Sequence, residues 1–171
     1  MTEESNNKFI RLSLACSYET APEILTEIAR TEKDDEDICC AIARNINTPI
    51  DTLKYLVGWR ATGDDGDYPY VKVSREVINN PALPISVLEK LLDCYINIGW
   101  LDLLSEFSQL SRLNVKMIEK LIEKFYPVFW LVDHPIVQDF PKLLDKIVHF
   151  SWEKSIHLKV LNNNLASILT I

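Results

Sequence analysis

Two stretches of the sequence decide the fold: ICCAIARNINTPIDTLKYL at residues 38–56 and VSREVINNPALPISVLEKL at residues 73–91. They begin 35 residues apart, and when aligned they share their apolar positions, an Asn and a Pro. Apolar residues four apart place one stripe of a short first helix inward, and apolar residues three apart do the same for a second helix. The two stretches therefore predict a recurring unit of two helices joined at a corner.

The residues at the corner suit helix ends. Asn tolerates the left-handed conformation that closes a helix better than any residue except Gly, so we expect Asn45 and Asn80 to be C-terminal caps. Pro49 and Pro84 fit the first position of the following helix, where a missing N–H costs nothing. Thr48 is placed to cap the N-terminus of that helix. Each corner should therefore end one helix and start the next.

The same frame extends in both directions with weaker corners. An earlier copy has Ser17 in the Asn position and Ala21 in the Pro position. The apolar pairs expected to face inward in the outer copies are Ile10 and Leu14 with Leu25 and Ile28, Leu103 and Phe107 with Ile118 and Leu121, and Val128 and Val132 with Leu144 and Ile147. A sixth first helix, carrying Ile156 and Val160, would act as a cap. The pattern predicts an all-α protein of about five to six irregular helix pairs.

A single domain is expected over residues 1–171, because one ordinary domain accommodates this length. Residues 1–8 are polar and acidic and should form a flexible N-terminus. Residues 58–70, GWRATGDDGDYPY, hold two of the four glycines and are predicted to be an inserted loop. Residues 153–171 would form the C-terminal capping repeat.

The corners NINTP at residues 45–49 and NPALP at residues 80–84 resemble those of the variant leucine-rich repeat family. Repeats of that family read as an Ala- and Val-rich helix, an Asn-Pro-x-Thr-Pro corner and a Leu-x-x-Leu helix. Ile46 stands where the family has Pro, and Leu83 where it has Thr. The resemblance, which is good over roughly residues 38–92, implies a right-handed α-solenoid of alternating α-helices and shorter, often 3₁₀, helices, similar in kind to HEAT repeats. It implies no shared catalytic residues.

Composition and charge indicate a globular protein of the cytoplasm. The chain is 47% hydrophobic and 25% charged, and no window approaches 18 uninterrupted apolar residues, so no membrane association is expected. MTEESNNKF lacks a secretory signal, and the four cysteines are expected to be reduced. Residues 1–37 hold ten carboxylates against four basic residues, whereas residues 68–171 are neutral. This distribution argues against nucleic acid as the principal partner.

No motif for catalysis, cofactor binding or metal binding is present. The three histidines are scattered, and a twelve-residue calcium loop starting at Asp65 would have Tyr70 at the position that needs Gly. Cys39 and Cys40 are adjacent on a helix and are predicted to be buried small residues. Lys116, Lys120 and Lys124 form a basic stripe, but neighbouring glutamates cancel much of its field. We therefore predict that the protein is not an enzyme and uses no cofactor.

Aromatic residues in the connections are the candidate partner contacts, because Trp, Tyr and Arg dominate binding hot spots. They are Trp59, Arg60, Tyr68 and Tyr70 in the long loop, and Trp100 and Trp130 in two later connections. Packing within or between repeats is the alternative role for the tryptophans. The leading hypothesis is a protein-interaction module, either an adaptor or a regulatory subunit. The rival is a HEAT-like solenoid that binds or repairs nucleic acid, which would need a basic groove. The partner's identity, the oligomeric state and the presence of a small-molecule pocket stay open.

Overall fold

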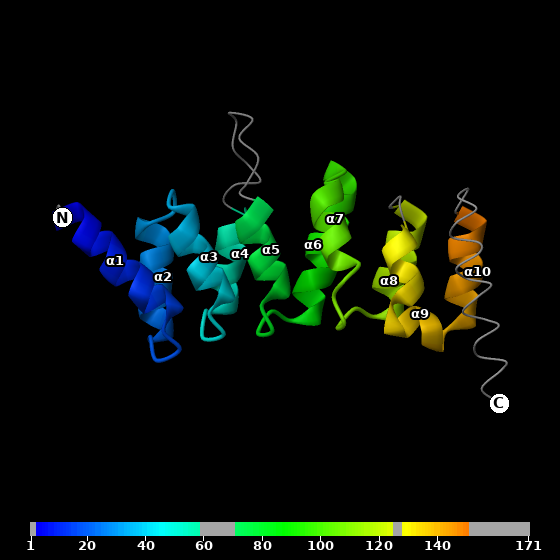
Figure 1. Ribbon diagram of the computed structural model, residues 1–171, viewed down its shortest axis with the longest axis horizontal. Helices are drawn as coiled ribbons and strands as arrows, with labels where there is room; N and C mark the ends of the chain where they lie inside the picture. The colour runs from blue at the N-terminus through cyan, green and yellow to red at the C-terminus, as the bar shows by residue number, and fades with distance from the viewer. Residues whose placement is uncertain (1–2, 59–70, 125–127, 151–171) are drawn as a thin grey trace. The chain divides into compact units, whose positions relative to one another are not determined.

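The computed structural model describes residues 3–58, 71–124 and 128–150. Every regular element in these ranges is a helix (Figure 1), which confirms the all-α prediction for them. The chain divides into two compact units, Met1–Leu88 and Glu89–Ile171, and each is described by itself.

The first unit has two rows of helices. Its elements are α1 (Glu3–Cys16), α2 (Pro22–Thr31), α3 (Glu36–Arg44), α4 (Ile50–Gly58), α5 (Val71–Asn79) and the first residues of α6 (Ile85–Ile98). Helix α3 packs between α1 and α5, while α2 lies beside α4 (Figure 1). The odd-numbered helices thus form one row and α2 and α4 the other.

The core of the first unit follows the apolar spacing of the sequence. Predicted inward residues that are buried are Leu25, Ile28, Ile38, Ile42, Leu53, Leu56, Val73 and Val77. The prediction is wrong for α1, in which Ile10 is 48% and Leu14 38% exposed. The reason is position: α3 is covered by α1 on one side and α5 on the other, whereas the main contacts of α1 with described helices are those with α2 and α3. The same apolar spacing therefore buries α3 but leaves one face of α1 open.

The second unit is built from shorter elements. They are the remainder of α6, α7 (Leu101–Phe107), α8 (Val115–Lys124), the 3₁₀ helix η1 (Val128–Asp133), α9 (Pro135–Asp139) and α10 (Pro141–Phe150). The predicted core residues Leu103, Phe107, Ile118, Leu121, Val132, Leu144 and Ile147 are buried. In α6, Leu92 is buried, whereas Leu91, which the frame aligns with Leu56, is only half-buried. Helix α10 packs against α8, α9 and η1.

The fifth first helix differs from the prediction. A 3₁₀ helix replaces the expected α-helix, and a separate short helix, α9, follows it before α10. The cause lies in Pro135 and Pro141, since the residue before a proline is driven out of helical conformation. His134 has φ −67° and ψ 131°, and Phe140 has φ −124° and ψ 87°. Two prolines therefore break this region into short pieces.

The corner backbone also differs from the prediction. Asn45 does end α3, but with φ −69° and ψ 123°, and no described residue except Gly has positive φ. The Thr48 hydroxyl donates to the Ile42 carbonyl at 2.6 Å, so it closes the preceding helix rather than capping the next. Helix α4 begins at Ile50, one residue after Pro49. Asn45 is therefore extended rather than left-handed, and it acts at the corner through its side chain.

Residues 1–8 were expected to form a flexible N-terminus, and within this segment α1 begins at Glu3. Lys8 Nζ lies 2.6 Å from Asp35 Oδ2, so an ion pair holds this helix to the α2–α3 connection. Residues 59–70 of the predicted loop and the whole predicted capping repeat lie outside the described residues.

Candidate functional site

A buried asparagine links each of two corners of the first unit to the corner before it. Asn45 Nδ2 donates to the carbonyls of Ala15 at 2.9 Å and Ser17 at 2.8 Å. Asn80 Nδ2 donates to the carbonyls of Ala43 at 2.7 Å and Asn45 at 3.0 Å. Both asparagines are 2% exposed. We call this chain of side-chain to backbone bonds the corner ladder.

The other half of each amide group closes its own corner. Asn45 Oδ1 accepts the Asn47 N–H at 3.0 Å, and Asn80 Oδ1 accepts the Ala82 N–H at 2.8 Å. Each amide thus serves two carbonyls and one N–H in buried or half-buried surroundings, where an unpaired polar group is costly. A carboxylate could accept but not donate. These two corners therefore need a side chain that both donates and accepts, as an amide does.

His134 has the same role in the second unit. It is 5% exposed, its Nε2 lies 3.0 Å from the Leu110 carbonyl, and its Nδ1 accepts the Ile136 N–H at 3.3 Å. Because Nδ1 accepts, the hydrogen-bond pattern assigns the proton to Nε2 of a neutral imidazole. The sequence analysis did not predict a corner role for His134, because it aligned the fifth copy on Val128 and Val132. The signal available was the His-Pro pair at residues 134–135.

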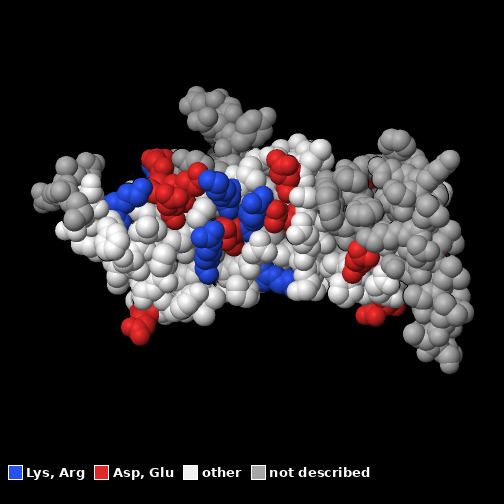
Figure 2. Space-filling view, viewed as in Figure 1, with Lys and Arg blue, Asp and Glu red and all other residues white. Residues whose placement is uncertain are grey.

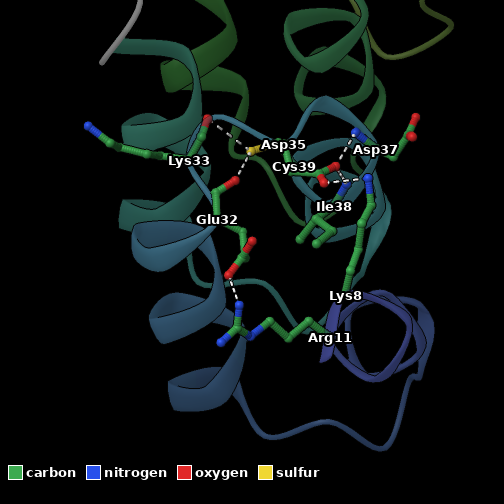
Figure 3. Close-up of polar contacts among 8 residues, drawn as sticks. All are labelled: Lys8, Arg11, Glu32, Lys33, Asp35, Asp37, Ile38 and Cys39. Atoms are coloured by element: carbon green, nitrogen blue, oxygen red, sulfur yellow. Dashed lines mark hydrogen bonds and ion pairs between the residues drawn. The ribbon is translucent and has the colours of Figure 1, made fainter. Parts of the chain in front are cut away.

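Ion pairs connect neighbouring elements of the first unit. Lys8 and Arg11 reach from α1 to the α2–α3 connection, where Lys8 pairs with Asp35 and Arg11 with Glu32 (Figure 3). The corresponding pairs between α3 and α5 are Arg44 with Glu76, at 2.5 Å, and Lys72 with Glu36, at 3.6 Å. Part of the acidic N-terminal third is therefore neutralised within the unit.

Asp35 combines an ion pair with a helix cap. Its carboxylate accepts the backbone N–H groups of Asp37 at 3.1 Å and Ile38 at 3.2 Å, at the start of α3. Burial alone would raise the pKa of Asp35, but the hydrogen bonds from Lys8 and from these two N–H groups outweigh it and lower that pKa below its ordinary value. The folded protein thus favours the charged form.

Asp35→Asn should separate the charge from the cap, since Asn caps helices about as well as Asp. We expect a loss of about 1 kcal/mol in the free energy of unfolding at pH 7. A lowered carboxyl pKa contributes stability above its unfolded value, and that contribution disappears as the pH falls through the folded value. The difference between wild type and variant should therefore shrink when urea denaturation is repeated at pH 3 and below. Asp51→Asn is the control, because the Asp51 side chain is 94% exposed, and it should change stability little at either pH.

The adjacent cysteines are buried, as predicted. Cys39 is 2% and Cys40 7% exposed, and Cys39 Sγ contacts the carbonyls of Glu32 at 3.5 Å and Lys33 at 3.6 Å. Burial raises the pKa of Cys40 to about 11, with smaller contributions from nearby glutamates. This thiol stays protonated at neutral pH and is a poor nucleophile. Cys16 and Cys94 are exposed, and all four cysteines are free.

A pocket of about 160 Å³ lies between α2 and α4. Its lining residues are Thr26, Arg30, Pro49, Asp51, Thr52 and Tyr55. The Thr26 hydroxyl donates to the Pro22 carbonyl at 3.0 Å, so in its 2.7 Å contact with Thr52 the Thr52 hydroxyl must be the donor. Cofactor and drug-sized sites occupy several hundred Å³. This pocket has room for one side chain.

The charged groups of the pocket differ in their pairing. The Asp51 carboxylate accepts a hydrogen bond from Lys54 Nζ at 2.9 Å. Arg30, in the last turn of α2, is exposed and forms no ion pair with any described residue. The pocket therefore presents an available guanidinium beside a partly neutralised carboxylate.

The predicted contact residues are not brought together within the described part of the chain. Trp59, Arg60, Tyr68 and Tyr70 lie outside the described residues, and Trp130 lies in η1 with its side chain likewise outside them. Trp100 precedes α7 and is half-buried. Its ring packs edge-on against Tyr95, with centroids 5.6 Å apart, and Tyr95 packs in the same way against Phe107 at 6.1 Å.

The lysine stripe of α8 is partly neutralised in the structure. Lys120 pairs with Asp93, and the two glutamates beside the stripe pair with Lys146, at 2.7 Å for Glu119 and 3.7 Å for Glu123. Lys116 and Lys124 are exposed. The helix presents a mixed charged face rather than a continuous cationic one.

The described residues contain neither a metal site nor a membrane-spanning helix. Among the described residues, no group of three or more His, Cys, Asp or Glu side chains is arranged to hold a metal ion. The same residues include no helix with the length and hydropathy needed to cross a membrane. A scan of protein-family models found no match to this chain, and searches of the curated proteins and of the solved structures found none either.

Proposed function

We propose that this chain is a non-catalytic protein-interaction module, either an adaptor or a regulatory subunit, and that it recognises its partner through the row formed by α2 and α4. The proposal includes a right-handed α-solenoid of about five to six irregular helix pairs, similar in kind to the variant leucine-rich repeats. In such an array each unit contacts only its neighbours, which leaves long surfaces free for binding.

The recurrence of one backbone bond supports the repeat architecture. At five corners a carbonyl accepts the N–H of the third residue after it, at 2.9 to 3.4 Å. The accepting residues are Ser17, Asn45, Asn80, Leu110 and His134. Four of the five, all but Leu110, also bind the N–H two residues on through their side chains. The same corner is thus built with three kinds of polar side chain.

The pocket between α2 and α4 is the observation that carries the interaction proposal. Its volume suits a single side chain of a polypeptide, as in the pockets that receive anchor residues at protein interfaces. Its lining contains no His or Cys, its one carboxylate is engaged by Lys54, and its two threonines bond to each other. A nucleophile paired with a base is missing from this lining, so recognition fits it better than catalysis.

The charge pattern favours a protein over nucleic acid as partner. On the face of the first unit drawn in Figure 2, acidic and basic side chains lie next to each other rather than in separate fields. Lys8, Arg11, Arg44 and Lys72 each pair with a carboxylate. A groove for a phosphate backbone needs cations that are not already neutralised.

A pocket-filling variant tests the proposal. Thr26→Phe should block the pocket, whereas Thr31→Phe places the same ring on the same helix outside the lining; circular dichroism would verify that both fold. We expect a protein captured from the native host by wild type and by Thr31→Phe to be lost with Thr26→Phe. The purified partner should then bind wild type and Thr31→Phe directly and bind Thr26→Phe much more weakly. A Trp59→Ala, Tyr70→Ala double variant would report separately on the long loop.

Two results would contradict the proposal. One is a salt-dependent mobility shift with duplex DNA in the absence of any protein partner. The other is a purified partner that binds wild type, Thr26→Phe and the loop double variant equally well.

A further inference from the structure

We infer that the pocket between α2 and α4 binds a carboxylate of the partner protein, with the uncharged part of that residue inside the pocket and the carboxylate on Arg30. The inference deepens the proposed function and rests on it. It specifies that the group bound at the pocket is a carboxylate.

Arg30 supplies the charge. Its guanidinium has five N–H donors in a planar fork that matches a carboxylate. Glu27, one turn earlier on α2, is not within ion-pair distance of Arg30, and no other described carboxylate is. By contrast, Lys54 on α4 is already bonded to Asp51. The cation at the pocket is therefore available to a ligand.

The interior of the pocket sets where the ligand's charge must lie. Pro49 and Tyr55 contribute ring surface. The Thr26 hydroxyl donates to the Pro22 carbonyl, and the Thr52 hydroxyl donates to Thr26, so neither is free to donate to a ligand. Burying a charge among such groups would be unfavourable because nothing there compensates it. Since Arg30 is exposed, the ligand's charge belongs at the mouth of the pocket and its uncharged atoms inside.

The same geometry selects a carboxylate over a phosphate. A phosphate carries close to two charges at neutral pH and is best held by several cations. This pocket has one arginine and also the Asp51 carboxylate, which Lys54 only partly offsets. With one cation and one partly neutralised carboxylate at the pocket, a planar group with a single negative charge fits better than a doubly charged one. Its source is either the C-terminal carboxylate of the partner or a Glu or Asp side chain.

Small probes can test this with the full-length chain. Backbone amide NMR signals would be followed during titration with N-acetyl-L-valine, N-acetyl-L-glutamic acid α-amide and N-acetyl-L-valinamide. We expect the two carboxylates to shift the signals of Thr26, Arg30, Thr52 and Tyr55, and the amide to have little effect. Stronger binding of the valine or of the glutamate derivative identifies the terminal or the side-chain carboxylate as the source, and either outcome supports the inference.

Variants and a competing anion complete the test. Arg30→Gln should weaken binding of the carboxylate probes about tenfold, because a charge-assisted hydrogen bond is lost. Lys116→Gln, which makes the same change in net charge on α8, should leave binding unchanged. The inference is overturned if valinamide binds as well as valine, if phosphoserine amide binds more tightly than either carboxylate, or if Arg30→Gln binds like wild type.

The two proposals can fail separately. If the carboxylate probes bind but no purified protein partner distinguishes Thr26→Phe from wild type, the interaction function fails and the pocket chemistry stands. If a partner does make that distinction while the probes show no preference for a carboxylate, only the chemical assignment fails.

Discussion

Replacing Asn80 with Ala should lower the free energy of unfolding by about 3 kcal/mol. The variant loses both donations from Nδ2, to the carbonyls of Ala43 and Asn45, and the acceptor for the Ala82 N–H. The Asn45 carbonyl keeps the Thr48 N–H, whereas the Ala43 carbonyl and the Ala82 N–H lose the Asn80 side chain as partner. Each polar group left without a partner costs about 1–3 kcal/mol, and relaxation or entering water recovers part of the total. Urea denaturation followed by circular dichroism would measure the effect.

Neighbouring and isosteric variants make this prediction specific. Asn79→Ala is the control, because Asn79 is exposed and donates only to the Arg75 carbonyl of its own helix, so the change should be below about 0.5 kcal/mol. Asn80→Asp keeps the shape and the acceptor but sets a carboxylate oxygen against two carbonyl oxygens, and it should destabilise at least as much as Ala. A cost for Asn80→Ala no larger than that for Asn79→Ala would show that the corner ladder contributes little.

His134→Ala should cost about 2 kcal/mol, and His134→Asn should recover most of that loss. The reason is that the His134 side chain forms the same kind of hydrogen bonds as Asn45 and Asn80: one to a carbonyl of the preceding corner and one to the N–H two residues on. An amide can donate toward the Leu110 carbonyl and accept the Ile136 N–H, the two bonds that the imidazole makes now. The same denaturation measurement applied to both variants would reveal the rescue.

The rescue distinguishes a corner role from simple packing. If His134 acted only by filling space, Asn and Ala would be similarly destabilising, and that result would refute the equivalence of the corners. Lys142→Ala is a suitable comparison, because Lys142 is exposed on α10 and its replacement should change stability by less than about 0.5 kcal/mol.

The helices were predictable because their core spacing is local. Ile38 and Ile42, or Leu53 and Leu56, lie on one face of a helix whatever surrounds it, and burial of that face follows. The exposure of Ile10 and Leu14 could not be predicted in the same way. It depends on which elements flank a helix in space, and the apolar spacing of α1 is the same as that of α3.

The hydrogen bonds from the corner asparagines to the preceding corner could not be predicted from the sequence, for a different reason. Their acceptors are backbone carbonyls in the preceding corner, such as those of Ala15 and Ser17 for Asn45, and any residue type offers a carbonyl. Local rules therefore assigned Asn45 and Asn80 to left-handed caps. Recurrence of Asn at equivalent positions was the signal that something beyond a cap was required.

The candidate pocket was also missed. The reasoning from residue types favoured aromatic side chains in connections, whereas the pocket arises where Thr26 and Arg30, four apart on α2, face Thr52 and Tyr55, three apart on α4. Each pair taken alone resembles an ordinary polar helix face. Only the lateral packing of α2 on α4 makes them a site.

The corner ladder has a consequence for how such a chain can change during evolution. The five corners in the described part of the chain close over the same three-residue step, and the amides at two of them donate to a carbonyl at an equivalent place in the corner before. An inserted residue at a corner would move a donor away from its acceptor, whereas an insertion at the opposite ends of the helices would not. Residues 59–70 connect α4 to α5 in the sequence, and the helix ends that they join, Gly58 and Val71, are the ends away from the corners. New surface can therefore be acquired there while the corners stay in register.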